Sequence, residues 1–165
     1  SVGRLVAALA KGFGMKIMAF DPFVPAEKMV AEGVEVAKDL NELYSKSNFV
    51  SLHIPATEQT KGSIGAALLK EMPKGGCLVN TARKEVINEA ELMQVLGERE
   101  DLKYITDVAP ANYAELKEKY GNRVFATPKK MGAETAEANI NAGLAAANQI
   151  VDFFTTGNKR FQVNK

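Results

Sequence analysis

The chain has 165 residues, of which 46% are hydrophobic and 25% are charged, and its 21 basic and 20 acidic residues give a formal net charge of +1 at pH 7. This composition is typical of one globular domain with a buried core, and it carries no basic stripe for nucleic acid and no apolar run long enough for a membrane span. The single Cys77 and the single His53 argue against a disulfide or a zinc site, so we expect no metal and a reducing, cytoplasmic location.

The first 21 residues predict part of a dinucleotide-binding unit. Gly3 begins an apolar helical run that ends near Gly12, and a short strand at 16–20 ends on the acid Asp21. In a Rossmann unit the last glycine of G-x-G-x-x-G brings backbone N–H groups to a pyrophosphate, and an acid about 20 residues on binds the ribose. A plain helix–strand turn is the alternative for this stretch alone. The first strand and the first two glycines are not in the chain, so we expect a fragment of a longer protein.

Strand-like and helical runs alternate along the rest of the chain. The remaining strands are predicted at 34–36, 48–54, 77–80, 104–108 and 123–126, and the remaining helices at 26–32, 39–46, 66–69, 88–96, 113–120 and 133–154. Asp39 and Asn88 each precede a glutamate by three residues, which is the pattern of a capping box, and Gly157 is placed to end the last helix. This alternation predicts an α/β fold, a doubly wound parallel sheet that lacks its first strand.

Polar and charged residues follow the predicted strands. In open α/β sheets ligands bind beyond the carboxyl ends of the strands. Those ends carry Asp21, then His53 with Pro55, then Asn80 to Arg83, then Asp107, and then Thr127 to Lys130. Together the five strand ends favour a binding site more strongly than any one of them does.

Four motifs in order carry a family resemblance: the stretch from Gly3 to Asp21, HIPATEQT at 53–60, MPKG at 72–75 and VNTAR at 79–83. The chain resembles the NAD-dependent D-2-hydroxyacid dehydrogenases and, within them, the short-type phosphoglycerate dehydrogenase branch. The resemblance covers nearly the whole chain. It implies that 1–165 is the Rossmann NAD-binding domain of a two-domain homodimeric enzyme, with the helix and tail at 133–165 returning toward a substrate domain that the chain does not contain.

The resemblance also assigns roles by position. Asp21 would hold the adenosine ribose, Gly3 would face the pyrophosphate, and the carbonyl of Ala82 with the carboxylate of Asp107 would anchor the nicotinamide carboxamide. Arg83 would bind the substrate carboxylate and polarise the reacting carbonyl. The full set of cofactor-binding residues that it implies is Gly3, Arg4, Leu5, Asp21, His53, Pro55, Thr60, Thr81, Ala82 and Asp107.

The general acid/base departs from the family pattern. The family usually places a His after Thr-Pro, oriented by a Glu, whereas this sequence has Lys129 and Lys130 there and no acid at 109–112. A free lysine has a pKa of about 10.4, which is too high for a base at neutral pH. Neighbouring cations and burial would disfavour its protonated form, so we hypothesise that Lys129 or Lys130 is the base in oxidation of 3-phosphoglycerate, a step of serine biosynthesis.

Several alternatives stay open. The enzyme could act on another 2-hydroxy acid, or the protein could be a dinucleotide sensor that has lost catalysis, although a sensor has little reason to keep Arg83. His53 could be an ordinary hydrogen-bonded residue, Asp107 could cap the next helix, and the lysine pair could be solvated. We further expect this chain alone to be inactive and to bind NAD weakly.

Overall fold

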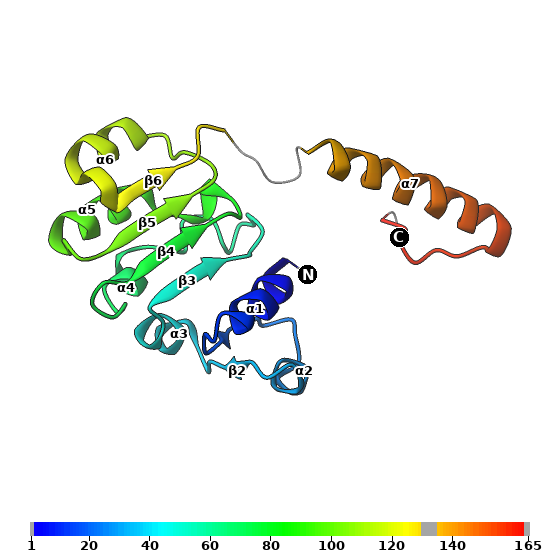
Figure 1. Cartoon of the computed structure of the whole chain (residues 1–165), viewed down its shortest axis with the longest axis horizontal. Helices are drawn as coiled ribbons and strands as arrows, with labels where there is room; N and C mark the ends of the chain where they lie inside the picture. The colour runs from blue at the N-terminus through cyan, green and yellow to red at the C-terminus, as the bar shows by residue number, and fades with distance from the viewer. Residues whose placement is uncertain (1, 130–134, 164–165) are drawn as a thin grey trace. The chain divides into compact units, whose positions relative to one another are not determined.

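The structure, a computed structural model, describes residues 2–129 and 135–163. The chain divides into two compact units, Ser1–Lys129 and Lys130–Lys165, and the first contains every strand of the described chain (Figure 1). Among the described residues, no helix has the length and apolar character that crossing a membrane requires.

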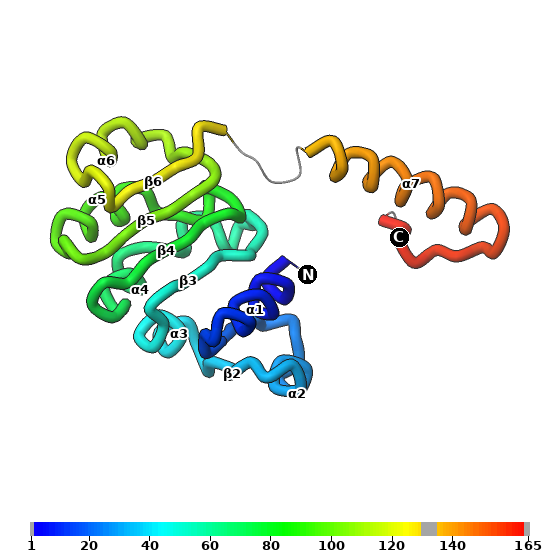
Figure 2. The backbone as a smooth tube through the Cα atoms, in the orientation of Figure 1, coloured from blue at the N-terminus to red at the C-terminus, as the bar shows by residue number. Residues whose placement is uncertain are grey.

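Helices and strands alternate along the first unit, as the tube in Figure 2 shows. Its helices are α1 Val2–Gly12, α2 Ala26–Ala31, α3 Leu40–Lys46, α4 Ala66–Leu69, α5 Glu89–Glu98 and α6 Tyr113–Tyr120, with 3-10 turns η1 Lys84–Val86 and η2 Gly121–Arg123. Its strands are β1 Met18–Ala19, β2 Glu35–Val36, β3 Phe49–Leu52, β4 Cys77–Asn80, β5 Lys103–Thr106 and β6 Val124–Ala126. All strand pairs are parallel, which confirms the predicted fold class.

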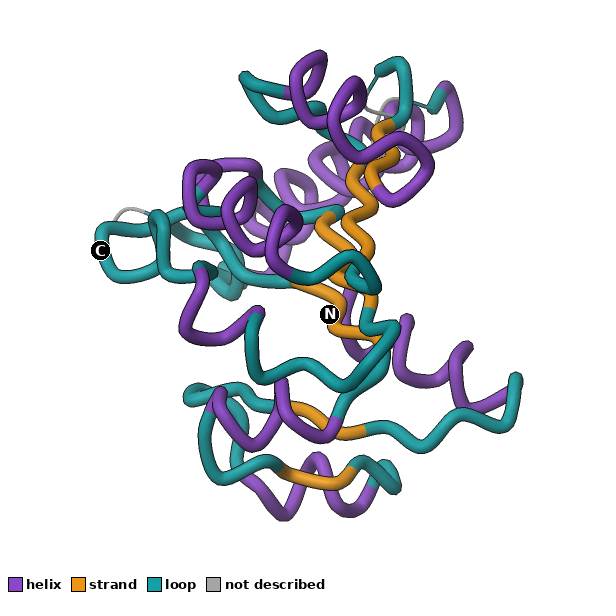
Figure 3. Tube along the Cα trace, turned by 90° about the vertical axis from the view of Figure 1, so that its left-hand side faces the viewer, coloured by secondary structure: helices purple, strands orange, loops and turns teal. Residues whose placement is uncertain are grey.

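The strands form two sheets, which Figure 3 shows as separate groups. One has the order β3-β4-β5-β6, and the other pairs β1 with β2. In the usual doubly wound order 3-2-1-4-5-6, the first strand lies between the second and the fourth, which here are β1 and β3. The prediction of a sheet without its first strand therefore accounts for the place at which the sheet divides.

The core lies on one face of the four-stranded sheet. Val50, Leu78, Tyr104 and Val124 stand in register across the strands and are buried with apolar side chains from α3, α4, α5 and α6. On the opposite face Ile105 and Phe125 remain 38% and 51% exposed. The doubly wound fold predicts helices on both faces of the sheet. Among the described residues of the first unit, α2 packs on β2 of the two-stranded sheet, and Lys11 at the end of α1 donates a hydrogen bond to the carbonyl of Glu32.

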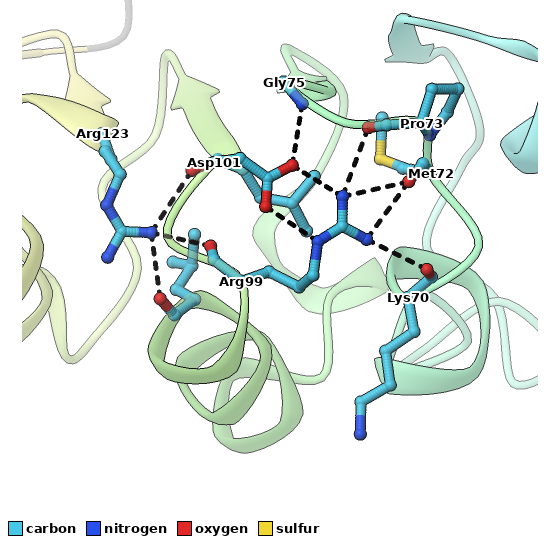
Figure 4. Close-up of polar contacts among 9 residues, drawn as sticks. Lys70, Met72, Pro73, Gly75, Arg99, Asp101 and Arg123 are labelled. Carbon is cyan, nitrogen blue, oxygen red and sulfur yellow. Dashed lines mark hydrogen bonds and ion pairs between the residues drawn. The ribbon is translucent and has the colours of Figure 1, made fainter.

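Two arginines fix the segments that lead into β4, β5 and β6 (Figure 4). Arg99 pairs with Asp101 at 2.7 Å, and the same carboxylate accepts the backbone N–H of Gly75 at 2.7 Å. These hydrogen bonds hold the pKa of Asp101 well below its usual range. Backbone carbonyls accept further hydrogen bonds from both side chains: Arg99 donates to those of Lys70, Met72 and Pro73, and Nη1 of Arg123 donates to those of Leu96, Arg99 and Leu102.

Predicted helix ends are mostly confirmed. Asp39 accepts the N–H of Glu42 at 2.8 Å, and Asn88 accepts that of Glu91 at 3.2 Å. In the second unit α7, Ala136–Thr156, is followed by Gly157 in the left-handed conformation at φ 74°. The predicted start of this helix at residue 133 lies outside the described residues, and its end is two residues later than expected.

Several strands are shorter than the predicted ones. The strand predicted at 104–108 ends at Thr106, because the Thr106 hydroxyl accepts the N–H of Val108 at 3.2 Å and turns the chain. The strand predicted at 123–126 begins at Val124, since Arg123 closes the turn η2 and its side chain is drawn to backbone carbonyls. The strands at 16–20 and 48–54 shrink to Met18–Ala19 and Phe49–Leu52.

Candidate functional site

The carboxyl ends of β4, β5 and β6 lie side by side. Asp107 donates its N–H to the carbonyl of Asn80 at 3.4 Å, and Thr127 donates its N–H to the carbonyl of Thr106 at 3.1 Å. The segments that follow these strands therefore start at one edge of the sheet. Within the described residues they carry five of the predicted site residues: Thr81, Ala82, Arg83, Asp107 and Lys129.

The turn after β4 is closed by the side chain of Asn80. Its Oδ1 accepts the N–H of Ala82 at 3.0 Å, and its Nδ2 donates to the carbonyl of Arg83 at 2.9 Å. The guanidinium of Arg83 is exposed and donates from Nη1 to the carbonyl of Ala82 at 2.9 Å. The two groups that the sequence assigned to substrate carboxylate and carboxamide are thus in direct contact, with Thr81 exposed beside them.

Asp107 follows β5 with an unsatisfied carboxylate oxygen. Its Oδ1 is buried and has no hydrogen-bond partner within the described chain. A buried carboxylate oxygen without a partner is costly, and it indicates a place where a donor from a ligand would bind. The alternative that Asp107 caps the next helix is wrong, because α6 begins after Asn112.

Lys129 lies after β6 and is exposed. Its carbonyl accepts the hydroxyl of Thr127 at 2.8 Å, and that hydroxyl also lies 3.0 Å from the carbonyl of Asp107. The turn after β6 is thereby held near the end of β5. Lys130, the other predicted base, lies outside the described residues.

Gly3 and His53 lie together at the start of α1 and the end of β3. A Cβ built on Gly3 would lie 3.2 Å from Cδ2 of His53, so the helix approaches the ring as closely as it does because residue 3 has no side chain. The ring Nε2 is 3.0 Å from Oγ of Ser51, and burial lowers the pKa of His53. His53 is therefore a half-buried, hydrogen-bonded residue that also lies beside the predicted pyrophosphate turn.

The loop after β3 is closed by Thr60. Its hydroxyl donates to the carbonyl of Pro55 at 2.6 Å and accepts the N–H of Thr57 at 2.8 Å. Further along, Gly62 donates to the carbonyl of Glu85 at 2.9 Å, which ties this loop to the segment after Arg83. Thr60 thus shapes the loop on which Pro55 stands.

Asp21 lies beyond the end of β1. Its Oδ1 accepts the N–H of Phe23 at 2.9 Å, which leaves Oδ2 without a hydrogen bond in the described part of the chain. An acid with a free oxygen at this position suits a ribose hydroxyl. No hydrogen bond or ion pair in the described chain joins the Asp21 side chain to the ends of β4, β5 and β6.

The first turn of α1 borders a cavity of about 720 Å³ between α1 and the segment from α2 to β2. The Arg4 side chain closes one side through an ion pair with Glu32 at 2.7 Å, and Leu5 contributes apolar surface. This cavity contains none of the residues at the ends of β3 to β6. The side chains of Arg4 and Leu5 thus line a cavity that those strand-end residues do not, while their backbone N–H groups lie in the first turns of the helix.

Two residues to which the sequence assigned no role lie at the site. Asn80 and Thr106 are the buried polar side chains of the described chain, at 1% and 2% exposure. Each is the last residue of its strand and follows two apolar residues, and this pattern could have indicated them. Within the described residues no cluster of three or more His, Cys, Asp or Glu side chains is placed to hold a metal.

Comparison with known proteins adds independent evidence. Residues 1–130 match the family described as D-isomer specific 2-hydroxyacid dehydrogenase, NAD binding domain. A D-3-phosphoglycerate dehydrogenase of Methanocaldococcus jannaschii is 36% identical over 90% of this chain and 28% of its own length, and a hydroxypyruvate reductase of Thermotoga maritima is 35% identical over 91% and 49%.

A solved structure of NAD+-bound 3-phosphoglycerate dehydrogenase from Entamoeba histolytica is 51% identical, with a TM-score of 0.87 over 99% of this chain and 52% of that one. The chain therefore spans about half or less of the length of the relatives that it matches.

Proposed function

Because this chain belongs to the D-isomer specific 2-hydroxyacid dehydrogenase family, as its NAD-binding domain, we propose that the intact protein oxidises 3-phosphoglycerate with NAD. The observation that carries the proposal is the contact of Arg83 with Ala82 after β4, together with the carboxylate oxygen of Asp107 after the neighbouring β5 that has no partner in the described chain. The similarity to phosphoglycerate dehydrogenases supports the choice of substrate, and that substrate would place the protein in serine biosynthesis.

The residues present fit the nicotinamide cofactor. Asp107 offers a buried acceptor that has no partner among the described residues, and the carbonyl of Ala82 follows the neighbouring strand, which together suit a carboxamide N–H₂. Within the same residues Asp21 keeps an oxygen without a hydrogen bond for the ribose, and Gly3 allows backbone to approach a pyrophosphate. When bound, NAD would supply the acceptor for the hydride that leaves the substrate carbon.

Arg83 and a lysine would act on the substrate. The planar guanidinium of Arg83 suits two-point binding of the substrate carboxylate, and its charge would polarise the adjacent C–O bond. The Nζ of Lys129 or Lys130 would take the hydroxyl proton as the hydride leaves, so that a carbonyl forms and the lysine becomes an ammonium. The choice of Lys129 as the base is supported by its place after β6. The choice of Lys130 is supported by its distance from Gly132 and Ala133 in the sequence.

The remaining proposals concern the intact protein. The family resemblance supports a homodimer in which residues 133–165 lead toward a substrate domain. A reduced Cys77, buried at the start of β4, supports a cytoplasmic location.

The test is NADH formation by the intact protein with 3-phosphoglycerate and with several other 2-hydroxy acids. We expect the highest kcat/KM for 3-phosphoglycerate and a loss of about 100-fold or more in Arg83→Ala, since the carboxylate loses a charged, bidentate partner. Lys129→Ala and Lys130→Ala separate the two bases, and Lys74→Ala, in a turn before β4, is the matched lysine control. Wild-type turnover in both lysine variants would exclude the lysine mechanism.

Two other outcomes would redirect the proposal. Faster turnover of a different acid would keep the reaction and change the substrate. Tight NAD binding with no turnover of any acid would instead support a dinucleotide sensor.

A further inference from the structure

We propose that Asn80, Thr106 and Thr127 are positioning residues that hold Arg83, the carbonyl of Ala82 and the turn carrying Lys129 in their working arrangement. The inference rests on the proposed function, because it concerns how that site is kept in shape. Each of the three side chains stands at the end of one of three adjacent strands, β4, β5 and β6, and bonds to the backbone of a segment that carries a proposed functional group.

Asn80 fixes the backbone of the turn that carries Arg83. Both ends of its amide are used, one on the N–H of Ala82 and one on the carbonyl of Arg83. These bonds define where the carbonyl of Ala82 points and the direction in which the Arg83 side chain leaves the chain. The amide itself is 1% exposed, so it cannot contact a ligand and acts through the turn.

Thr106 links that turn to the next strand. Its hydroxyl donates to the carbonyl of Asn80 at 2.8 Å and accepts the N–H of Val108 at 3.2 Å. Asp107 lies between Thr106 and Val108 in the chain, so this hydroxyl holds the backbone on both sides of it. Thr127 continues the chain of contacts, with its hydroxyl within 3.0 Å of the carbonyl of Asp107 and 2.8 Å of that of Lys129.

Packing alone does not explain these polar residues. Leu52, Asn80, Thr106 and Ala126 form one row across the sheet, and all four are buried. A buried polar side chain that is hydrogen-bonded contributes only modestly to stability, and the bonds of Asn80 and Thr106 go to the backbone of the strand ends and of the segments that follow them. Their effect on the positions of the reacting groups accounts for their presence, since displacement of such a group by about 1 Å can cost about 100-fold in rate.

The experiment compares two asparagines in the intact protein. Asn80→Ala removes both amide bonds in the site, whereas Asn88→Ala removes a cap of similar geometry at the start of α5. For Asn80→Ala we expect kcat/KM to fall about 100-fold, mostly through KM for the acid, because displaced Arg83 binds it poorly. Affinity for ADP-ribose, which lacks nicotinamide, should stay within twofold. Asn88→Ala should lower the Tm by about as much as Asn80→Ala does, and it should keep kcat/KM within twofold of the wild type.

Thr106 provides a second pair of variants that preserves shape. Thr106→Val removes the hydroxyl with little change in volume and should lower kcat/KM about tenfold, since a single hydrogen bond is worth about 1 kcal/mol or somewhat more. Thr106→Ser, which keeps the hydroxyl, should have most of the wild-type kcat/KM. If Asn80→Ala does not fold, the two Thr106 variants test the positioning role in its place.

The outcomes separate the two hypotheses. If the wild type is active and both Asn80→Ala and Thr106→Val keep its kinetics, the positioning role is overturned and the proposed function is not. Equal loss of ADP-ribose affinity and turnover shows general damage and also overturns it. A wild type that reduces no NAD with any 2-hydroxy acid overturns the proposed function, and the positioning role with it.

Discussion

At the scale of single residues, the environment of His53 couples two parts of the site. The ring lies against the first turn of α1, bonds to Ser51, and is half-buried at the end of β3. Burial disfavours the charged imidazolium, which lowers its pKa. The neutral ring is therefore the form that suits the close contact with Gly3.

This environment predicts how stability depends on pH. Because the pKa of His53 is lower in the folded state, the unfolded state takes up the proton first as pH falls below about 6.5, and stability is lost over that range. His53→Gln should lose this part of the pH dependence. Urea unfolding at pH 7.5, 6.5 and 5.5 checks it, and parallel curves for the wild type and the variant would contradict it.

At the scale of elements, the approach of α1 to β3 depends on Gly3. Alanine is favoured over glycine inside a helix by about 1 kcal/mol, so loss of stability is not the expected effect of adding a methyl group here. The added Cβ would instead press on the His53 ring at 3.2 Å. A small displacement of the first turn would follow, which matters only where backbone N–H groups contact a ligand.

We therefore expect Gly3→Ala to weaken NAD affinity about tenfold in the intact protein with little change in Tm. The matched control is Gly12→Ala at the other end of the same helix, where an added Cβ meets no atom within 4 Å. Isothermal titration with NAD measures both. Equal affinities in the two variants would show that the close approach has no part in binding.

The elements also show what the sequence can and cannot predict. Helix starts at Asp39 and Asn88 follow from local side-chain bonds, and those bonds are present. Strand ends were overestimated at Asp107 and Val108, because the turn there depends on the Thr106 hydroxyl and a neighbouring strand. In the same way the ends of parallel strands indicate where a site lies, but not which distant segments pair there, such as the N–H of Asp107 with the carbonyl of Asn80.

At the scale of the whole first unit, the hydrogen bonds of two arginines connect the segments that lead into the strands. The Arg99–Asp101 pair and the carbonyls around it join the segments before β4 and β5, and Arg123 joins the end of α5 to the segment before β6. Both carboxylate oxygens of Asp101 are hydrogen-bonded, which is why its pKa is depressed.

Asp101→Asn should lower the free energy of unfolding by about 1–2 kcal/mol at pH 7, because charge-assisted hydrogen bonds become neutral ones. Since the folded-state pKa is depressed, the wild type begins to lose this advantage as pH falls below about 4, and the difference between the two proteins should be smaller at pH 3.5 than at pH 7. Urea titrations at pH 7 and pH 3.5 measure this, with the exposed Glu118→Gln as control. A difference that is constant with pH would argue against the charge as the cause.

The separation of these arginine contacts from the strand ends has a consequence for evolvability. Within this chain, mutations that alter substrate preference would fall mainly in the segments after the strands, at 81–83, 107–112 and 127–129, which the Arg99–Asp101 contacts do not involve. Drift there, outside Arg83, Asp107 and Lys129, would leave the Arg99 contacts intact, so selection can exchange specificities without losing the scaffold. A directed-evolution library confined to those segments, with these three residues kept, would therefore retain the fold more often than one that also varies the Arg99 contacts.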